Sequence, residues 1–172
     1  MPTHPLAFMR IPATWLMAFD SRWLHFWMQP VHHLVRMAHI LSMAAFFGGI
    51  GLLDLRLLGW RGTVPLRPFA ANVLPWLYAT FAVALASGVM LFLYDPVHVG
   101  AHAYFTPKLI LIALGLLNAT VYHRTGYVAA LAAETRMPAS ARAAGAVSLA
   151  IWTGVIVCSC LNIEPAPRVL LR

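Results

Sequence analysis

The chain has 172 residues, which is enough for one domain. It is 61% hydrophobic and only 10% charged, whereas about a quarter of the residues in a soluble domain are charged. This composition argues against a soluble protein and predicts an integral membrane protein. The net charge of +7 does not indicate nucleic-acid binding, because the basic residues stand singly between apolar runs and form no patch.

The first 30 residues carry large aromatic side chains at helical spacing. The aromatic residues are Trp15, Phe19, Trp23 and Phe26, and the polar residues Asp20, Arg22 and His25 fall between them. This pattern predicts that residues 1–30 form an amphipathic helical segment in the membrane interface, where tryptophan is favoured. A fifth membrane span is disfavoured because Asp20 and Arg22 would lie at its centre.

Residues 31–164 contain four long apolar stretches, at about 34–58, 70–94, 104–127 and 140–163. Each is long enough to cross a hydrocarbon core of about 30 Å, which takes roughly twenty helical residues. Small residues such as Gly49, Gly88 and Gly145 allow such helices to approach closely. The sequence therefore predicts an all-α fold, a membrane four-helix bundle in the lipid bilayer, followed by a C-terminal tail over residues 165–172.

Four spans place the loops on two sides of the membrane. Side A holds the N-terminal segment, the start of the first span, the loop between the second and third spans, and the tail; side B holds the other two loops. Basic residues in the loops between spans favour side B as cytoplasmic. We therefore expect a multi-pass protein of the bacterial inner membrane, with side A toward the periplasm. Seven of the eight histidines fall on side A.

His39 is the principal candidate for a functional residue, because it lies about 9 Å inside the first span at about 1.5 Å per residue. An ionisable residue within a membrane helix is a functional candidate by default, and imidazole suits haem iron and copper. The alternative is a histidine bonded to a neighbouring backbone carbonyl. His32 lies seven residues earlier and shares a helix face with His39, whereas His33 points elsewhere.

Two other charged positions stand within or beside the spans. Lys108 opens the third span on side A, where it either faces inward and pairs with an acidic group or extends to the lipid headgroups. Asp54 closes the first span near side B, and we expect a structural ion pair with Arg56, Arg124 or Arg142. The sequence shows no nucleophile–base–acid set, so whether the protein is an enzyme stays open; any catalysis would depend on a bound cofactor.

Several short motifs carry a resemblance to known membrane proteins. They are HIL at 39–41, FGG at 47–49, DLRLLG at 54–59, FTPK at 105–108, LN at 117–118, YHR at 122–124 and the segment 141–152. Together they resemble an uncharacterised family of small bacterial four-helix membrane proteins, over roughly residues 31–160. The first span resembles, more distantly, the CopD-type copper-resistance proteins and the HemJ-type protoporphyrinogen oxidases. HemJ-type proteins bind haem b through a histidine of the first helix, so this resemblance implies haem b at His39, with Gly49, Arg56 and Lys108 fitting the outline.

Three hypotheses follow for the function. In the first, the protein is a small cytochrome b-like protein that transfers electrons with a quinone or a periplasmic redox partner. His39 is then one axial ligand, His98, His102 or Met90 the other, and Lys108 or Arg36 holds a propionate. Since no second histidine lies at the depth of His39, the second ligand would come from a loop or from another subunit of an oligomer.

In the second hypothesis the protein handles copper. The metal ligands would be drawn from His32, His33, His39 and His102, together with Met37, Met43 and Met90. In the third, the protein is a cofactor-free accessory or scaffold subunit, and His39, Asp54 and Lys108 have structural roles.

Overall fold

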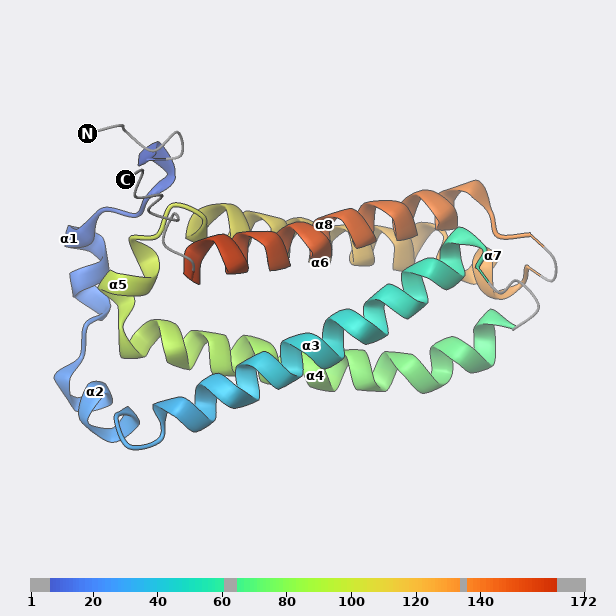
Figure 1. Cartoon of the computed structure of the whole chain (residues 1–172). Helices are drawn as coiled ribbons and strands as arrows, with labels where there is room; N and C mark the ends of the chain where they lie inside the picture. The colour runs from blue at the N-terminus through green and yellow to red at the C-terminus, as the bar shows by residue number, and fades with distance from the viewer. Residues whose placement is uncertain (1–6, 61–64, 134–135, 164–172) are drawn as a thin grey trace, which may run out of the picture.

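The computed structural model describes residues 7–60, 65–133 and 136–163, and Figure 1 shows its path. Within these ranges the secondary structure is helical, with no strand. The elements are, in order, η1 (Ala7–Met9), α1 (Ala13–Leu16), η2 (Met17–Phe19), α2 (Arg22–Met28), α3 (His32–Leu58), α4 (Leu66–Tyr94), α5 (Pro96–Gly100), α6 (Phe105–Thr125), α7 (Tyr127–Leu131) and α8 (Ala139–Ile163). The predicted tail, residues 165–172, lies outside the described residues.

Four of these helices, α3, α4, α6 and α8, are long and apolar enough to cross a membrane. They confirm the four predicted apolar helices, with shifted ends. α4 begins at Leu66, before Pro68 and not after it, because proline is tolerated in the first turn of a helix. α6 ends at Thr125 before Gly126, and Tyr127 starts the separate helix α7, so the third span is shorter than predicted.

The long helices form two antiparallel pairs, α3 with α4 and α6 with α8, and contacts between α3 and α8 connect the pairs. Figure 1 shows α3 crossing from the α4 side, at the end with α1, α2 and α5, to α8 at the end with α7. The crossing brings the C-terminal half of α3 against α8, so the two pairs diverge toward side A, where α1, α2 and α5 lie.

Aromatic packing fills the middle of the bundle. The Phe46 and Trp152 rings meet edge to face with centroids 4.7 Å apart, and Leu77 and Val155 complete this buried cluster. Gly115 lets α6 approach the indole, because a Cβ atom there would lie 2.9 Å from Cζ2 of Trp152. These contacts hold α3, α4, α6 and α8 together at mid-height.

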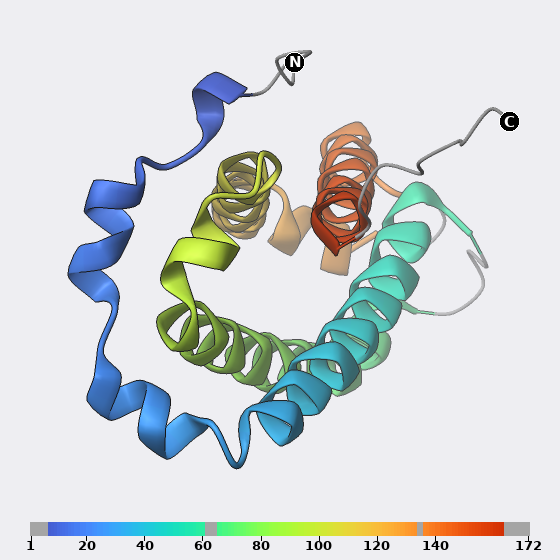
Figure 2. The same ribbon diagram turned by 60° about the vertical axis from the view of Figure 1, so that its left-hand side comes forward.

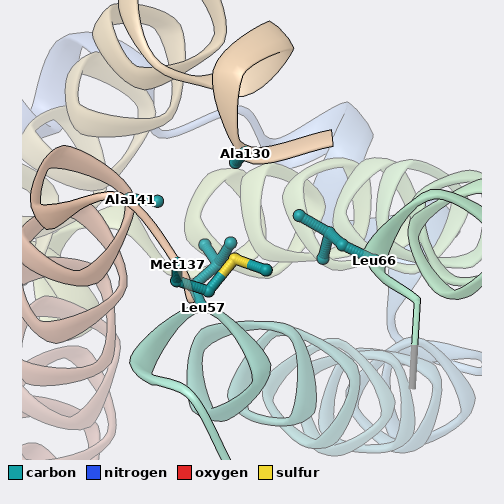
Figure 3. Packing of buried hydrophobic residues seen from close by; sticks show 5 residues of the cluster. All are labelled: Leu57, Leu66, Ala130, Met137 and Ala141. Carbon is teal, nitrogen blue, oxygen red and sulfur yellow. The ribbon is translucent and has the colours of Figure 1, made fainter. Parts of the chain in front are cut away.

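A second buried cluster closes the side B end of the bundle, and Figure 3 shows it from close by. Its members come from α3, α4, α7, the segment before α8, and α8: Leu57, Leu66, Ala130, Met137 and Ala141. The cluster is apolar throughout. It therefore seals the end of the bundle beyond Asp54.

The N-terminal segment differs from the single amphipathic helix that the sequence predicts. Its helical turns break at Asp20, whose backbone is extended, and Ser21 then caps α2 by accepting a hydrogen bond from the Leu24 amide at 3.4 Å. Figure 2 shows α1 and α2 as an arc outside α4 and α5. The buried side chains here are Leu16 and Met28, and the predicted aromatic face stays exposed. A Cβ atom at Gly100 of α5 would lie 2.5 Å from Leu16, so this leucine fixes the arc to the bundle.

Candidate functional site

His39 lies on the face of α3 that packs against α4. Its Nδ1 is 2.9 Å from the carbonyl oxygen of Ala84 and 3.1 Å from Oγ of Ser87. A carbonyl oxygen only accepts hydrogen bonds, so Nδ1 must carry a hydrogen atom. In a neutral imidazole the lone pair is then on Nε2. The arrangement therefore gives His39 one nitrogen tied to the protein and one nitrogen able to bind a ligand.

The surface of α4 under this ring is made of small residues. Ala84 and Gly88 are one turn apart, and a Cβ atom at Gly88 would lie 3.0 Å from Cε1 of His39. Ser87 donates a hydrogen bond from its hydroxyl to the carbonyl of Val83 at 2.5 Å. Serine hydroxyls within helices commonly bond to the carbonyl four residues earlier. The Ser87 oxygen thus stays available as an acceptor for His39. Ala84 and Gly88 thus belong to the surface of α4 against which the imidazole packs.

Lys108 approaches this region from α6. It is half-buried, and its Nζ lies 5.4 Å from the centroid of the Phe105 ring. The charge of Lys108 also acts on His39 of α3 and on Cys158 of α8. Both expectations for Lys108, an inward-facing cation and a side chain that extends to the lipid headgroups, stay predictions.

His32 lies at the N-terminal end of α3 and, like His39, contacts α4. Its ring stacks on Tyr94 with centroids 5.2 Å apart, and its Nδ1 lies 2.8 Å from the carbonyl of Gln29. His32 and His39 are seven residues apart on α3, and their partners Tyr94 and Ser87 are seven apart on α4. The predicted shared face is therefore confirmed. His25 of α2 also stacks on Tyr94, at 4.5 Å, so these rings connect α2, α3 and α4.

The remaining candidate ligands lie in other surroundings. His33 is exposed and meets His32 edge to face, while His98 and His102 meet each other at 4.9 Å near α5. Nδ1 of His102 lies 2.6 Å from the carbonyl of His98. Arg36 and Met90 are exposed. Within the described ranges, no three His, Cys, Asp or Glu side chains are grouped closely enough to hold a metal ion.

Asp54 occupies the opposite half of α3, where that helix meets α8. A Cβ atom at Gly145 would lie 3.0 Å from the carbonyl oxygen of Asp54. The Asp54 side chain is only 2% exposed. It hydrogen-bonds with the side chain of Ser148, and within residues 7–60, 65–133 and 136–163 its Oδ2 has no hydrogen-bond partner. Arg56 is buried and Arg142 is exposed, and the expected ion pair of Asp54 stays a prediction.

The sequence analysis did not single out Ser87, which the structure places 3.1 Å from Nδ1 of His39. Ser87 lies in an apolar helix next to Gly88, and a serine beside a glycine in a span is a weak signal for close helix packing. Its proximity to His39 depends on how α3 and α4 are rotated about their axes. Sequence spacing within one helix does not contain that information.

Comparison with protein-family models gives no match, and comparisons with curated proteins and with solved structures give none either. The family resemblance carried by the DLRLLG segment therefore stays a prediction. The functional argument depends on the geometry at His39 alone.

Proposed function

We propose that this is an integral membrane protein that binds haem b through His39 and transfers electrons with a quinone or a periplasmic redox partner. The observation that carries the proposal is the hydrogen bond between Nδ1 of His39 and the carbonyl of Ala84, at 2.9 Å. Histidines that bind metals usually donate their other ring N–H to a carbonyl or carboxylate, which fixes the tautomer and the ring orientation. His39 has this second partner within its membrane span.

The surroundings of His39 fit a haem in two further respects. The Gly88 surface leaves the imidazole close to the α4 backbone, so Ala84 and Ser87 hold the ring plane rigidly. Lys108 supplies a half-buried cation whose charge reaches His39 and that suits a carboxylate such as a propionate, and Arg36 lies one turn before His39. Bound haem would supply one-electron redox chemistry, with a potential set by its ligands and surroundings.

In this proposal His39 would be the ligand that the chain itself provides. The other candidates are Met90, which is 43% exposed, and His98 and His102, which contact each other. A second ligand from these residues requires a rearrangement near α5 or a second copy of the chain. We therefore assign His39 as the protein ligand and leave the opposite position to a loop, a second subunit or an exogenous ligand.

The test is the visible spectrum of the protein purified from cells supplied with haem, first oxidised and then reduced with dithionite. We expect a Soret band and a sharp α-band in the reduced wild type, and their loss in His39→Ala. His123→Ala is the matched control, because His123 is exposed at the opposite end of the bundle and stacks on Tyr127. A featureless spectrum from well-folded wild-type protein, or a spectrum that His39→Ala leaves unchanged, would contradict the proposal. Metal analysis of the same sample would then separate copper binding from a cofactor-free scaffold.

The proposal also includes the placement of the chain in the bacterial inner membrane, with side A toward the periplasm. It is supported by the aromatic side chains of α1 and α2, which are exposed although large: Trp23, for example, is 71% exposed. Such residues are favoured at a membrane interface, so we place the N-terminal segment in the outer interface.

Orientation can be tested with single cysteines in a Cys158→Ala, Cys160→Ala background. We expect a membrane-impermeant maleimide to label Asp20→Cys in intact spheroplasts, and Arg124→Cys only after permeabilisation. Both positions are exposed, and they lie at opposite ends of the bundle. The reverse pattern would contradict the orientation.

A further inference from the structure

Asp54 is the only carboxyl group within the four candidate spans. It stands one turn before the end of α3 and its side chain is 2% exposed, although an aspartate is among the residues least often buried. Neither the haem proposal nor the packing of the bundle requires a carboxyl group here. Its chemistry therefore needs an explanation of its own.

Among the residues that the structure describes, the groups around Asp54 offer little that would stabilise a negative charge. On α8, Ser148 provides the hydrogen bond to the carboxyl, and Gly145 brings the helix backbone against α3. Leu57 and the apolar cluster at side B close the far side. Oδ2 is buried and without a hydrogen-bond partner.

Three other polar groups lie on the elements nearby. Arg56 is on α3 itself, two residues away, and residues two apart on a helix project about 200° apart. Arg142 of α8 is exposed. Tyr122 of α6 packs against the side B cluster, and its own hydroxyl is buried without a hydrogen-bond partner. A carboxylate with a single hydroxyl donor in such a place is far more costly than the neutral acid.

We propose that Asp54 is a proton-binding site: in the folded protein its carboxyl group is un-ionised, and it takes up one proton from side B water when α8 packs onto α3. The Ser148 hydroxyl donates to one carboxyl oxygen, and the proton is bound to the other. Release of the proton leaves a carboxylate, which requires water and therefore requires α8 to move away from α3. Proton binding and the α3–α8 contact are thus coupled.

The chain is well suited to a direct test because it has three aspartates, Asp20, Asp54 and Asp95, and the other two are exposed. The full-length protein, labelled with carbon-13 at the aspartate side-chain carboxyl and reconstituted in nanodiscs, is examined by NMR. At neutral pH we expect two carboxylate signals and one un-ionised carboxyl signal, the last absent in Asp54→Asn. Three carboxylate signals would overturn the proposal. Should Asp54→Asn fail to fold, Asp20→Asn and Asp95→Asn assign the third signal by elimination.

The coupling to packing is tested with a matched pair of glycine variants. In Gly145→Ala the added methyl group meets the Asp54 backbone, whereas a Cβ atom at Gly48 has nothing within 4 Å. We expect Gly145→Ala to convert most of the Asp54 signal to carboxylate at neutral pH and Gly48→Ala to leave it unchanged. An Asp54 signal that stays un-ionised in a folded Gly145→Ala protein would overturn the coupling.

Discussion

The two halves of α3 each carry a polar side chain, and the two side chains differ in burial and in hydrogen bonding. His39, in the half near side A, is only partly buried, and α4 supplies two acceptors for its Nδ1. Asp54, in the half near side B, is sealed between α3 and α8 with one of its oxygens unpartnered. The crossing of α3 causes this difference, because it opens the bundle at one end and closes it at the other. We therefore propose ligand binding for His39, which is held in a fixed orientation at the open end, and proton binding for Asp54, which is buried at the closed end.

The largest loss of stability is expected where Trp152 of α8 packs on Phe46, near the middle of α3. We expect Trp152→Ala to lower the free energy of unfolding by about 3–5 kcal/mol, because it removes a buried aromatic residue and leaves a cavity. Unfolding in a mixed-micelle denaturant titration measures this change. Trp76→Ala is the control, since Trp76 is 73% exposed; an equal loss in both variants would contradict the central role of Trp152.

The second-largest loss of stability is expected at the closed end of the bundle, where α3 packs on α8. We expect Gly145→Ala to cost about 1–3 kcal/mol of unfolding free energy, the usual range for overpacking, because its methyl group would lie 3.0 Å from the Asp54 carbonyl. The same titration measures it, with Gly51→Ala as the control, where nothing lies within 4 Å of the new Cβ atom. Equal stability of the two variants would show that α3 and α8 do not approach closely at Asp54.

At the open end, Ser87→Ala removes one of the two acceptors of His39 and leaves the Ala84 carbonyl in place. We expect a loss of about 0.5–1.5 kcal/mol of unfolding free energy, which is typical of one hydrogen bond. The haem spectrum should persist with a shifted band position, as expected when a residue that supports the ligand is changed. Complete loss of the spectrum in a stable variant would show that Ser87 does more than support the ring.

The smallest change is expected for Asp54→Asn. A neutral acid and an amide are similar in size and charge, so the variant should lie within about 1 kcal/mol of the wild type. If Asp54 were instead ionised and paired with an arginine, breaking the buried pair would cost about 3–5 kcal/mol. Thermal or denaturant unfolding of this one variant therefore distinguishes a proton site from the ion pair that the sequence suggested.

The sequence predicted the helices well because their signal is local. Each of the four helices is long and apolar enough to cross a membrane, and Gly59 and Asp95 end α3 and α4 at the predicted positions. The N-terminal segment was predicted less well. Its aromatic spacing suggested one helix, but the chain bends at Asp20 so that Leu16 can pack on α5. That contact is long-range, and no local pattern indicates it.

For the candidate site, the sequence identified His39, Lys108 and Asp54 because charge within an apolar run is conspicuous. It could not supply their partners, since Ala84, Ser87 and Ser148 are inconspicuous in composition. Which faces of α3, α4 and α8 meet depends on side-chain packing around Phe46 and Trp152. The sequence therefore indicates the positions to study, and the structure shows what each of them contacts.

The most direct test of the central claim is a haem titration of the purified, cofactor-depleted protein, followed through the Soret band. The account predicts saturable binding of one haem per chain, weakened at least about tenfold in His39→Ala, which corresponds to about 1.4 kcal/mol, and unchanged in His123→Ala. Equal affinity in wild type and His39→Ala would contradict the assignment of His39 as the ligand.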